Sequence, residues 1–254
     1  MSWIVWATLG YLMNAVALAT DKALLARRSV GNPAVYTLSI SALGLLVLLL
    51  IPFGFSWPGF TYVGYALGSG LAFTLGLWLL FVVLEHGEAS RVPAFVGALS
   101  PVFVFAAAYF FLGERLVVTE VFAFALLCLG GFTMVGGPGG LSMRYKFFAI
   151  VAAASFGLAA VCLKLAFLGS TFVTGLILTR LSGFVASLLL FLIPGTWAAF
   201  RQGVGHSQGG ARFAFIGGQV AGAASGLLNN YAITLASVTL VNALQGVQYI
   251  FLLI

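Results

Sequence analysis

Long apolar runs are the feature of this sequence that most restricts its fold. Each is close to the roughly 20 apolar residues that a membrane-crossing helix needs. A backbone in lipid must satisfy its own hydrogen bonds, so we expect helices rather than open strands. Of 254 residues, 62% are hydrophobic, against about 45–50% in soluble domains. The sequence therefore predicts an all-α, multi-pass membrane protein of the cell membrane. Its nine predicted spans are 3–25, 33–53, 62–84, 90–112, 117–136, 146–168, 172–194, 211–233 and 236–254.

Charged residues lie mainly between these runs. A net charge of +6 would suggest nucleic acid in a soluble protein. Here the basic residues flank apolar spans, where they orient helices in the bilayer, so we expect lipid and no nucleic acid as partner. The spacing of Cys128 and Cys162 fits no metal site, and we predict neither metal nor cofactor. The longest connection runs from Pro194 to Arg212 and contains four glycines, which predicts a loop.

Similar residues recur in order along the chain, which indicates a duplication. Two matches share an offset of 142 residues and a third has an offset of 147. We therefore divide the chain into repeats at 1–140 and 141–254. Five helices per repeat would make the second copy enter from the opposite face, as in the inverted repeats of many transporters. The matches are Lys22 with Lys164, Ile51-Pro52 with Ile193-Pro194, and Ala89-Ser90 with Ala236-Ser237.

The fourth span and the turn after it hold the most specific motifs, Ala98-Leu99-Ser100-Pro101 and Leu112-Gly113-Glu114-Arg115-Leu116. Together with the repeat, they resemble the EamA-type branch of the drug/metabolite transporter superfamily. The resemblance implies a ten-helix permease that moves a small metabolite by alternating access. The second copy has Gln248 where proline is expected and lacks a Gly-Glu-Arg turn. We accordingly expect a chain truncated before its tenth helix.

Orientation, oligomeric state and rival functions stay open at this point. Seven basic residues would face the cytoplasm under the positive-inside rule, which puts the amino terminus outside, whereas family members have cytosolic termini. The chain could act alone or as a homodimer. An enzyme is not expected, because His86 and His206 lie in different loops and no buried nucleophile accompanies a base. The alternative to a permease is a non-transporting receptor or assembly protein on the same scaffold.

Two basic residues within the spans are candidates for substrate binding. Arg180 is the ninth residue of its span, about 12 Å along the helix. A guanidinium there could anchor a carboxylate or phosphate; alternatively, it bonds carbonyls of a neighbouring helix. Lys164 lies nearer a helix end, and no acidic residue follows Glu120. We hypothesise that an amino acid or another carboxylate-bearing anion binds near Arg180 and Lys164.

Amides and one tryptophan form a second group of candidates. Asn242, Gln245 and Gln248 follow one another at intervals of three and therefore share a helical face. Such a stripe either lines a wet cavity or joins helices by hydrogen bonds. Asn14 and Asn229 are amides in other spans, and Trp78 could stack on a planar substrate or simply pack.

Two prolines inside the fourth span, Pro93 and Pro101, are predicted hinges. Proline removes a backbone donor and can kink a helix. Glu114 and Arg115 follow that span, and we expect them to close a tight turn rather than carry protons.

Overall fold

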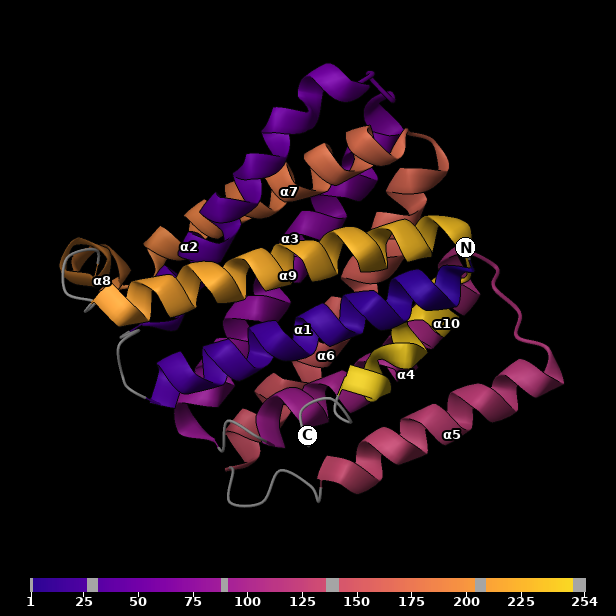
Figure 1. The fold of residues 1–254 in the computed structure, drawn as a ribbon, viewed down its shortest axis with the longest axis horizontal. Coiled ribbons are helices and arrows are strands. Elements are labelled where there is room, and N and C mark those ends of the chain that lie inside the picture. The colour runs from indigo at the N-terminus through magenta and orange to yellow at the C-terminus, as the bar shows by residue number, and fades with distance from the viewer. Residues whose placement is uncertain (1, 27–31, 88–90, 136–141, 204–208, 249–254) are drawn as a thin grey trace.

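The protein is a bundle of helices in a computed structural model, which describes residues 2–26, 32–87, 91–135, 142–203 and 209–248 (Figure 1). The part before residue 140 contains α1 (Trp3–Ala26), α2 (Pro33–Leu43), the 3₁₀ helix η1 (Gly44–Phe53), α3 (Phe60–His86), α4 (Arg91–Phe111) and α5 (Val118–Val135). The rest contains α6 (Met143–Leu168), α7 (Phe172–Leu188), the 3₁₀ helix η2 (Leu189–Leu192), α8 (Thr196–Gly203), α9 (Gly209–Leu235), α10 (Val238–Ala243) and the 3₁₀ helix η3 (Leu244–Gly246).

Six helical segments among the described residues are long and apolar enough to cross a membrane. They are α1, α2 with η1, α3, α4, α6 and α7 with η2. Large apolar side chains cover their outer surface, including Phe60, Phe110 and Leu192, which are about 80% exposed. A surface of this kind suits lipid rather than water. The all-α membrane fold thus agrees with the sequence, whereas the count of nine spans and the inverted repeat remain predictions.

Local signals fix where several of these helices begin and end. Asn32 caps α2 by accepting hydrogen bonds from the amides of Ala34 and Val35, and Pro33 occupies the first turn. Thr171 caps α7 through the amide of Thr174. η1 ends at Gly54, whose φ of +122° few other residues adopt.

Two antiparallel helix pairs form the centre of the bundle. One pair is α1 with α9, which lie side by side (Figure 1). Within it, Gly218 of α9 packs on Thr20 of α1, and Gly10 of α1 packs on Asn229. In the other, Gly68 of α3 packs on Cys162 of α6. Because glycine has no side chain, the helices approach closely at these positions, as they do at small residues in other membrane proteins.

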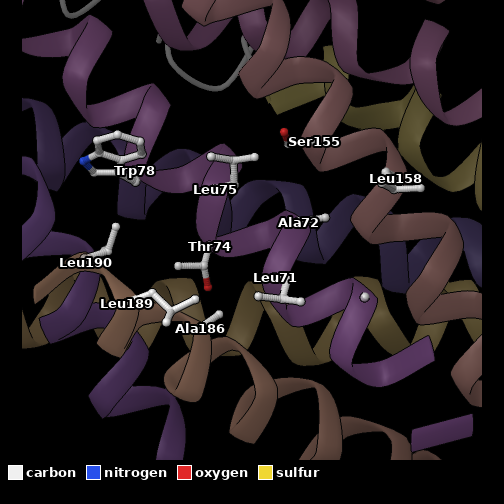
Figure 2. A pocket seen from close by; sticks show the side chains of 11 residues that line it. Leu71, Ala72, Thr74, Leu75, Trp78, Ser155, Leu158, Ala186, Leu189 and Leu190 are labelled. Carbon is white, nitrogen blue, oxygen red and sulfur yellow. The ribbon is translucent and has the colours of Figure 1, made fainter. Parts of the chain in front are cut away.

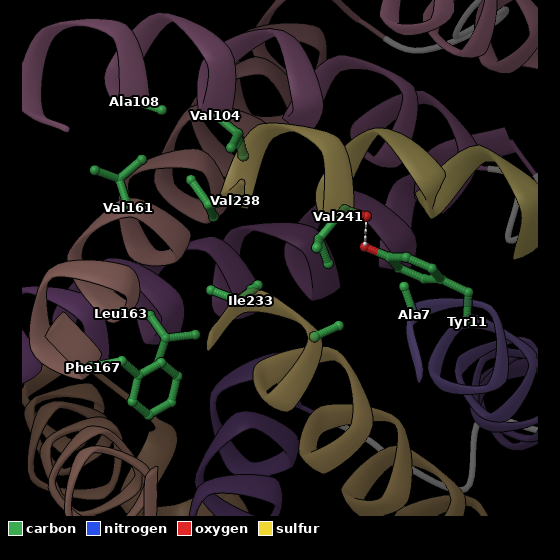
Figure 3. Packing of buried hydrophobic residues seen from close by; sticks show 11 residues of the cluster. Ala7, Tyr11, Val104, Ala108, Val161, Leu163, Phe167, Ile233, Val238 and Val241 are labelled. Atoms are coloured by element: carbon green, nitrogen blue, oxygen red, sulfur yellow. Dashed lines mark hydrogen bonds between the residues drawn. The ribbon is translucent and has the colours of Figure 1, made fainter. Parts of the chain in front are cut away.

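A buried apolar cluster joins both parts of the chain at the end of the bundle where α9 leads into α10 (Figure 3). It draws on α1, α4, α6, α9 and α10. The Tyr11 hydroxyl donates to the carbonyl of Val241 at 3.0 Å and so ties α1 to α10. We call this region the α9–α10 end. Its buried members are Ala7, Tyr11, Val104, Ala108, Val161, Leu163, Phe167, Ala232, Ile233, Val238 and Val241.

The structure differs from the sequence prediction in the long connection after Pro194. Part of that predicted loop is the short helix α8, on which Trp197 and Phe200 stack at 6.1 Å between ring centroids. Residues 249–254 of the ninth predicted span and the Ala89-Ser90 pair lie outside the described residues.

Candidate functional site

Arg180 lies where four structural elements meet. It is the ninth residue of α7, and its guanidinium carbon is 5.8 Å from the ring centroid of Phe73 on α3. A Cβ added to Gly226 of α9 would lie 2.5 Å from its Nη2 atom. A Cβ added to Gly44, where η1 begins, would lie 3.7 Å from its Cδ atom. Helices from both predicted repeats therefore surround this one cation.

The Arg180 guanidinium makes no hydrogen bond or ion pair with the residues that the structure describes, although the side chain is half-buried. The Phe73 ring supplies only a cation–π contact at the outer limit of about 6 Å. Carbonyls of a neighbouring helix, the alternative that the sequence left open, are not its partners among those residues. A charged side chain inside a membrane is costly unless another group compensates its charge. The guanidinium carries five N–H donors, and a bound anion could accept hydrogen bonds from them.

Lys164, in contrast, has partners. Its Nζ donates to the carbonyls of Ile233 at 2.6 Å and Ala236 at 2.9 Å, at the carboxyl end of α9. These carbonyls lie seven and ten residues beyond Gly226, so about 10–15 Å separates the two cations along α9. Lys164 and Arg180 therefore contact different parts of α9, and an anion site shared by both stays a prediction.

Glu114 forms hydrogen bonds with the same connection between α9 and α10, on the side where α10 begins. Its carboxylate accepts hydrogen bonds from the hydroxyls of Ser237 and Thr239 at 2.7 and 2.8 Å, and from the amide of Val238 at 3.0 Å. Gly113 adopts a φ of +65°, as a tight turn requires. The turn was expected from the sequence. Its contact with α10, more than 120 residues further along the chain, was not.

Most of the side-chain amides predicted to bind substrate instead form hydrogen bonds with other protein groups, and one has no hydrogen-bond partner among the described residues. Asn14 Nδ2 donates to Oε1 of Gln248 at 2.6 Å, and Gln248 is 1% exposed. Asn242 Nδ2 donates to the carbonyl of Val238 in its own helix. Gln245 is half-buried and bonds no described residue. Of the three amides, η3 contains only Gln245, and the stripe that they were expected to form stays a prediction.

Asn229 has one satisfied and one unsatisfied atom. Nδ2 donates to the hydroxyl of Ser225 at 3.3 Å, whereas Oδ1 is buried without a partner among the described residues and lies against Gly10. Asn230, on the same helix, is half-buried and bonds no described residue. Asn230 is one turn from Gly226, and residues four apart share a helical face. Asn230 is therefore a candidate second polar group for the Arg180 site.

Trp78 lines a cavity between α3, α6, α7 and η2 (Figure 2). The cavity has a volume of about 440 Å³, and its walls are mainly aliphatic. Arg180 is not among the lining residues. Leu71, Leu75, Leu158 and Leu189 line the cavity and are 43–56% exposed, so it opens toward the lipid-facing surface. Trp78 consequently lies apart from the Arg180 site.

The two predicted hinge residues differ in position. Pro93 is the third residue of α4, where amide hydrogens have no intrahelical acceptor, so its ring removes no helix hydrogen bond. A hinge is therefore not favoured there. Pro101 is buried in the middle of α4 and leaves the carbonyl of Gly97 without its usual donor. It remains a candidate hinge.

Sequence reasoning missed Phe73 and Gly226, because an aromatic and a glycine are ordinary in apolar helices. Among the described residues, no group of three or more His, Cys, Asp or Glu side chains could hold a metal ion. Comparison of the chain with protein-family models finds no match, and comparison with curated proteins finds no similar sequence.

Proposed function

We propose that this protein is a permease of the EamA type in the cell membrane, and that it moves a small carboxylate-bearing or otherwise anionic metabolite by alternating access. One observation carries the proposal: the Arg180 guanidinium lies at the meeting of helices from both repeats with no hydrogen-bonding partner among the described residues. A planar guanidinium binds carboxylates in bidentate fashion. An anionic substrate would supply the charge that the surrounding helices do not.

The packing of the helices supports the two inverted repeats, 1–140 and 141–254. Thr20 and Cys162, which are 142 residues apart, occupy corresponding places in α1 and α6. Thr20 packs on Gly218 of α9, and Cys162 packs on Gly68 of α3. Each first helix thus pairs with the third helix of the other repeat. A pseudo-twofold axis between the repeats would produce this exchange.

The second helix of each repeat has the same departure from α geometry. α2 continues into the 3₁₀ helix η1, which contains Ile51-Pro52, and α7 continues into the 3₁₀ helix η2 just before Ile193-Pro194. Runs of 3₁₀ helix longer than three or four residues are uncommon, and η1 has ten. A shared unusual feature at the matched sequence positions favours a common origin for the two halves.

Alternating access gives a physical role to the position of Arg180. Phe73 and Gly44 come from the first repeat, whereas Gly226 and Arg180 itself come from the second. Movement of one repeat against the other would therefore open the site to one side of the membrane and then to the other. Asn230 of α9 would offer an amide to the same substrate.

Uptake into liposomes tests the function. Purified protein is reconstituted and supplied with radiolabelled amino acids, other carboxylates and nucleosides. We expect uptake of at least one anionic or zwitterionic solute. Arg180→Gln should reduce its kcat/KM roughly 30-fold or more, as loss of one partner from a buried charge pair does. Arg180→Lys should recover part of the loss, because a point charge remains without the planar fork.

Arg201→Gln is the matched control. Arg201 is an exposed arginine of α8 that contacts Trp197, and its loss should leave uptake unchanged. Equal uptake by the Arg180→Gln and original proteins would overturn the proposal. A correctly folded protein that transports none of these solutes would favour the non-transporting receptor.

A further inference from the structure

The α9–α10 connection is held from both of its sides by charged groups of other helices. On the α10 side, the Glu114 carboxylate accepts from the hydroxyls of Ser237 and Thr239 and from the amides of Val238 and Thr239. On the α9 side, Lys164 Nζ donates to the carbonyls of Ile233 and Ala236. We call Glu114 and Lys164 together the clamp.

The signs of the two charges suit the two helix ends. An amino-terminal helix end carries partial positive charge and a carboxyl-terminal end partial negative charge. The carboxylate is at the start of α10 and the ammonium is at the end of α9. Breaking the clamp would leave these backbone groups at the two helix ends without their charged partners.

The clamp connects the two predicted repeats. Glu114 lies between α4 and α5, in the first repeat, whereas the connection that it binds belongs to the second. Glu114 would have to release Ser237 and Thr239 if the repeats separated at this end. The clamp is therefore placed where a rocking motion would be resisted.

The remainder of the α9–α10 end is closed by packed side chains. The apolar cluster around Tyr11, Val104 and Val241 fills the space between the helices (Figure 3). A chain of aromatic rings adds to it: Tyr231 of α9 contacts Trp6 of α1 at 5.4 Å and Phe172 of α7 at 5.6 Å between ring centroids. This layer lies between the clamp and the level of Arg180 along α9.

Among the residues that the structure describes, the hydrogen bonds that join the α1–α9 pair to other helices lie at the same end. Tyr11 and Asn14 of α1 bond Val241 and Gln248, and the last turn of α9 receives Lys164. Toward the other end, Thr20 and Gly218 pack on each other.

We propose that the clamp is the closed gate of the transport cycle: its integrity keeps the α9–α10 end shut, and its release opens the Arg180 site to that side. The inference rests on the proposed function, because a gate implies alternating access. Lys164 and Glu114 act in it as positioning residues, and neither touches the substrate.

Accessibility of one cysteine beside Arg180 measures the gate without requiring transport. The reporter is Asn230→Cys in a chain whose native cysteines are replaced, Cys128→Ala and Cys162→Ala. Vesicles are treated with a membrane-impermeant maleimide on each side separately. A second reporter, Arg115→Cys, identifies the side that the α9–α10 end faces, because Arg115 is exposed next to Glu114.

Clamp variants are expected to open that side. Glu114→Gln or Lys164→Met should raise the initial rate at which the Asn230→Cys reporter is modified from the α9–α10 side by roughly tenfold or more, as loss of charge-assisted hydrogen bonds implies. Thr239→Val removes one bond at little steric cost and should act in the same direction, more weakly. Size-exclusion profiles in detergent show which variants are folded.

Glu120→Gln is the matched control, since Glu120 also caps a helix start by accepting from the amide of Val117 at 3.0 Å. It should leave the modification rate unchanged. Unchanged rates in folded clamp variants, Thr239→Val included, would overturn the gate. A changed modification rate in a protein that takes up no solute would preserve the gate as a structural device and refute transport instead. The two failures are thus distinguishable.

Discussion

At the scale of single residues, the close approach of Gly226 to Arg180 fixes the position of the guanidinium. Any Cβ at position 226 would meet the guanidinium at 2.5 Å. The contact atom is the end of a flexible side chain, so the guanidinium can move while the helices stay in place. Substrate recognition should therefore respond more strongly than stability.

Gly226→Ala should raise the KM for the transported anion several-fold and leave the unfolding temperature in detergent nearly unchanged. Displacement of a positioned charge by about 1 Å is enough for such a loss. Uptake kinetics and thermal unfolding measure the two quantities. Gly64→Ala is the control, because nothing lies within 4 Å of its added Cβ. Equal effects of the two substitutions would contradict the placement of Arg180.

The Asn14–Gln248 hydrogen bond is a second residue-scale feature. Asn14→Leu would leave the side-chain oxygen Oε1 of Gln248 buried without this donor. We expect a loss of about 1 kcal/mol in the free energy of unfolding, near the values measured between membrane helices. Combining Asn14→Leu with Gln248→Leu should cost less than the sum of the single changes. Strict additivity in that double-mutant cycle would argue against the contact.

At the scale of elements, close helix contacts at glycines set the packing. A Cβ on Gly70 of α3 would lie 2.5 Å from the backbone nitrogen of Gly183 on α7. Backbone cannot move aside as a flexible side chain can. Gly70→Ala should therefore destabilise the fold by about 1–3 kcal/mol, as overpacking does in other cores.

Unfolding by denaturant in detergent checks this value. Gly217→Ala, at a site with open space around the added Cβ, should change stability by a few tenths of a kcal/mol at most. If both substitutions proved equally harmless, the α3–α7 contact would be wrong.

Elements were predictable where local signals set them. The 33–53 and 172–194 segments were expected from apolar length, and the structure begins helices at Pro33 and Phe172, where Asn32 and Thr171 supply caps. The eight-residue α8 was missed because glycine-rich sequence surrounds it and it is too short to show an apolar period. The 3₁₀ winding of η1 also has no signal in an unbroken apolar run.

Contacts between distant elements were not predictable from one sequence. Glu114 was expected to close a turn, but its bond to Ser237 spans 123 residues. Because no acid follows Glu120 in the chain, the sequence could not say where Lys164 would find an opposite charge. The fold brings Glu114, from the first half of the chain, to the same connection. Trp78 was a reasonable candidate by residue type, yet it lines a cavity of which Arg180 is not a lining residue.

At the scale of the whole molecule, the proposed inverted repeat predicts the topology. In that arrangement α1 and α6 are equivalent helices, which should enter the bilayer from opposite sides. Ser2→Cys and Met143→Cys are both exposed positions at the starts of these helices. Impermeant maleimide applied to sealed, uniformly oriented vesicles should label one of them from outside and the other only after permeabilisation. Labelling of both from the same side would exclude the inverted arrangement.

Counterflow tests most directly the claim that one site around Arg180 faces the two sides of the membrane in turn. Liposomes are loaded with an excess of unlabelled substrate, identified by the uptake panel, and diluted into a trace of labelled substrate. A carrier that exchanges one for the other accumulates label transiently above its equilibrium level. We predict this overshoot for the original protein and for Arg201→Gln, and its loss in Arg180→Gln. Simple equilibration without overshoot, in protein shown to be folded, would contradict the account.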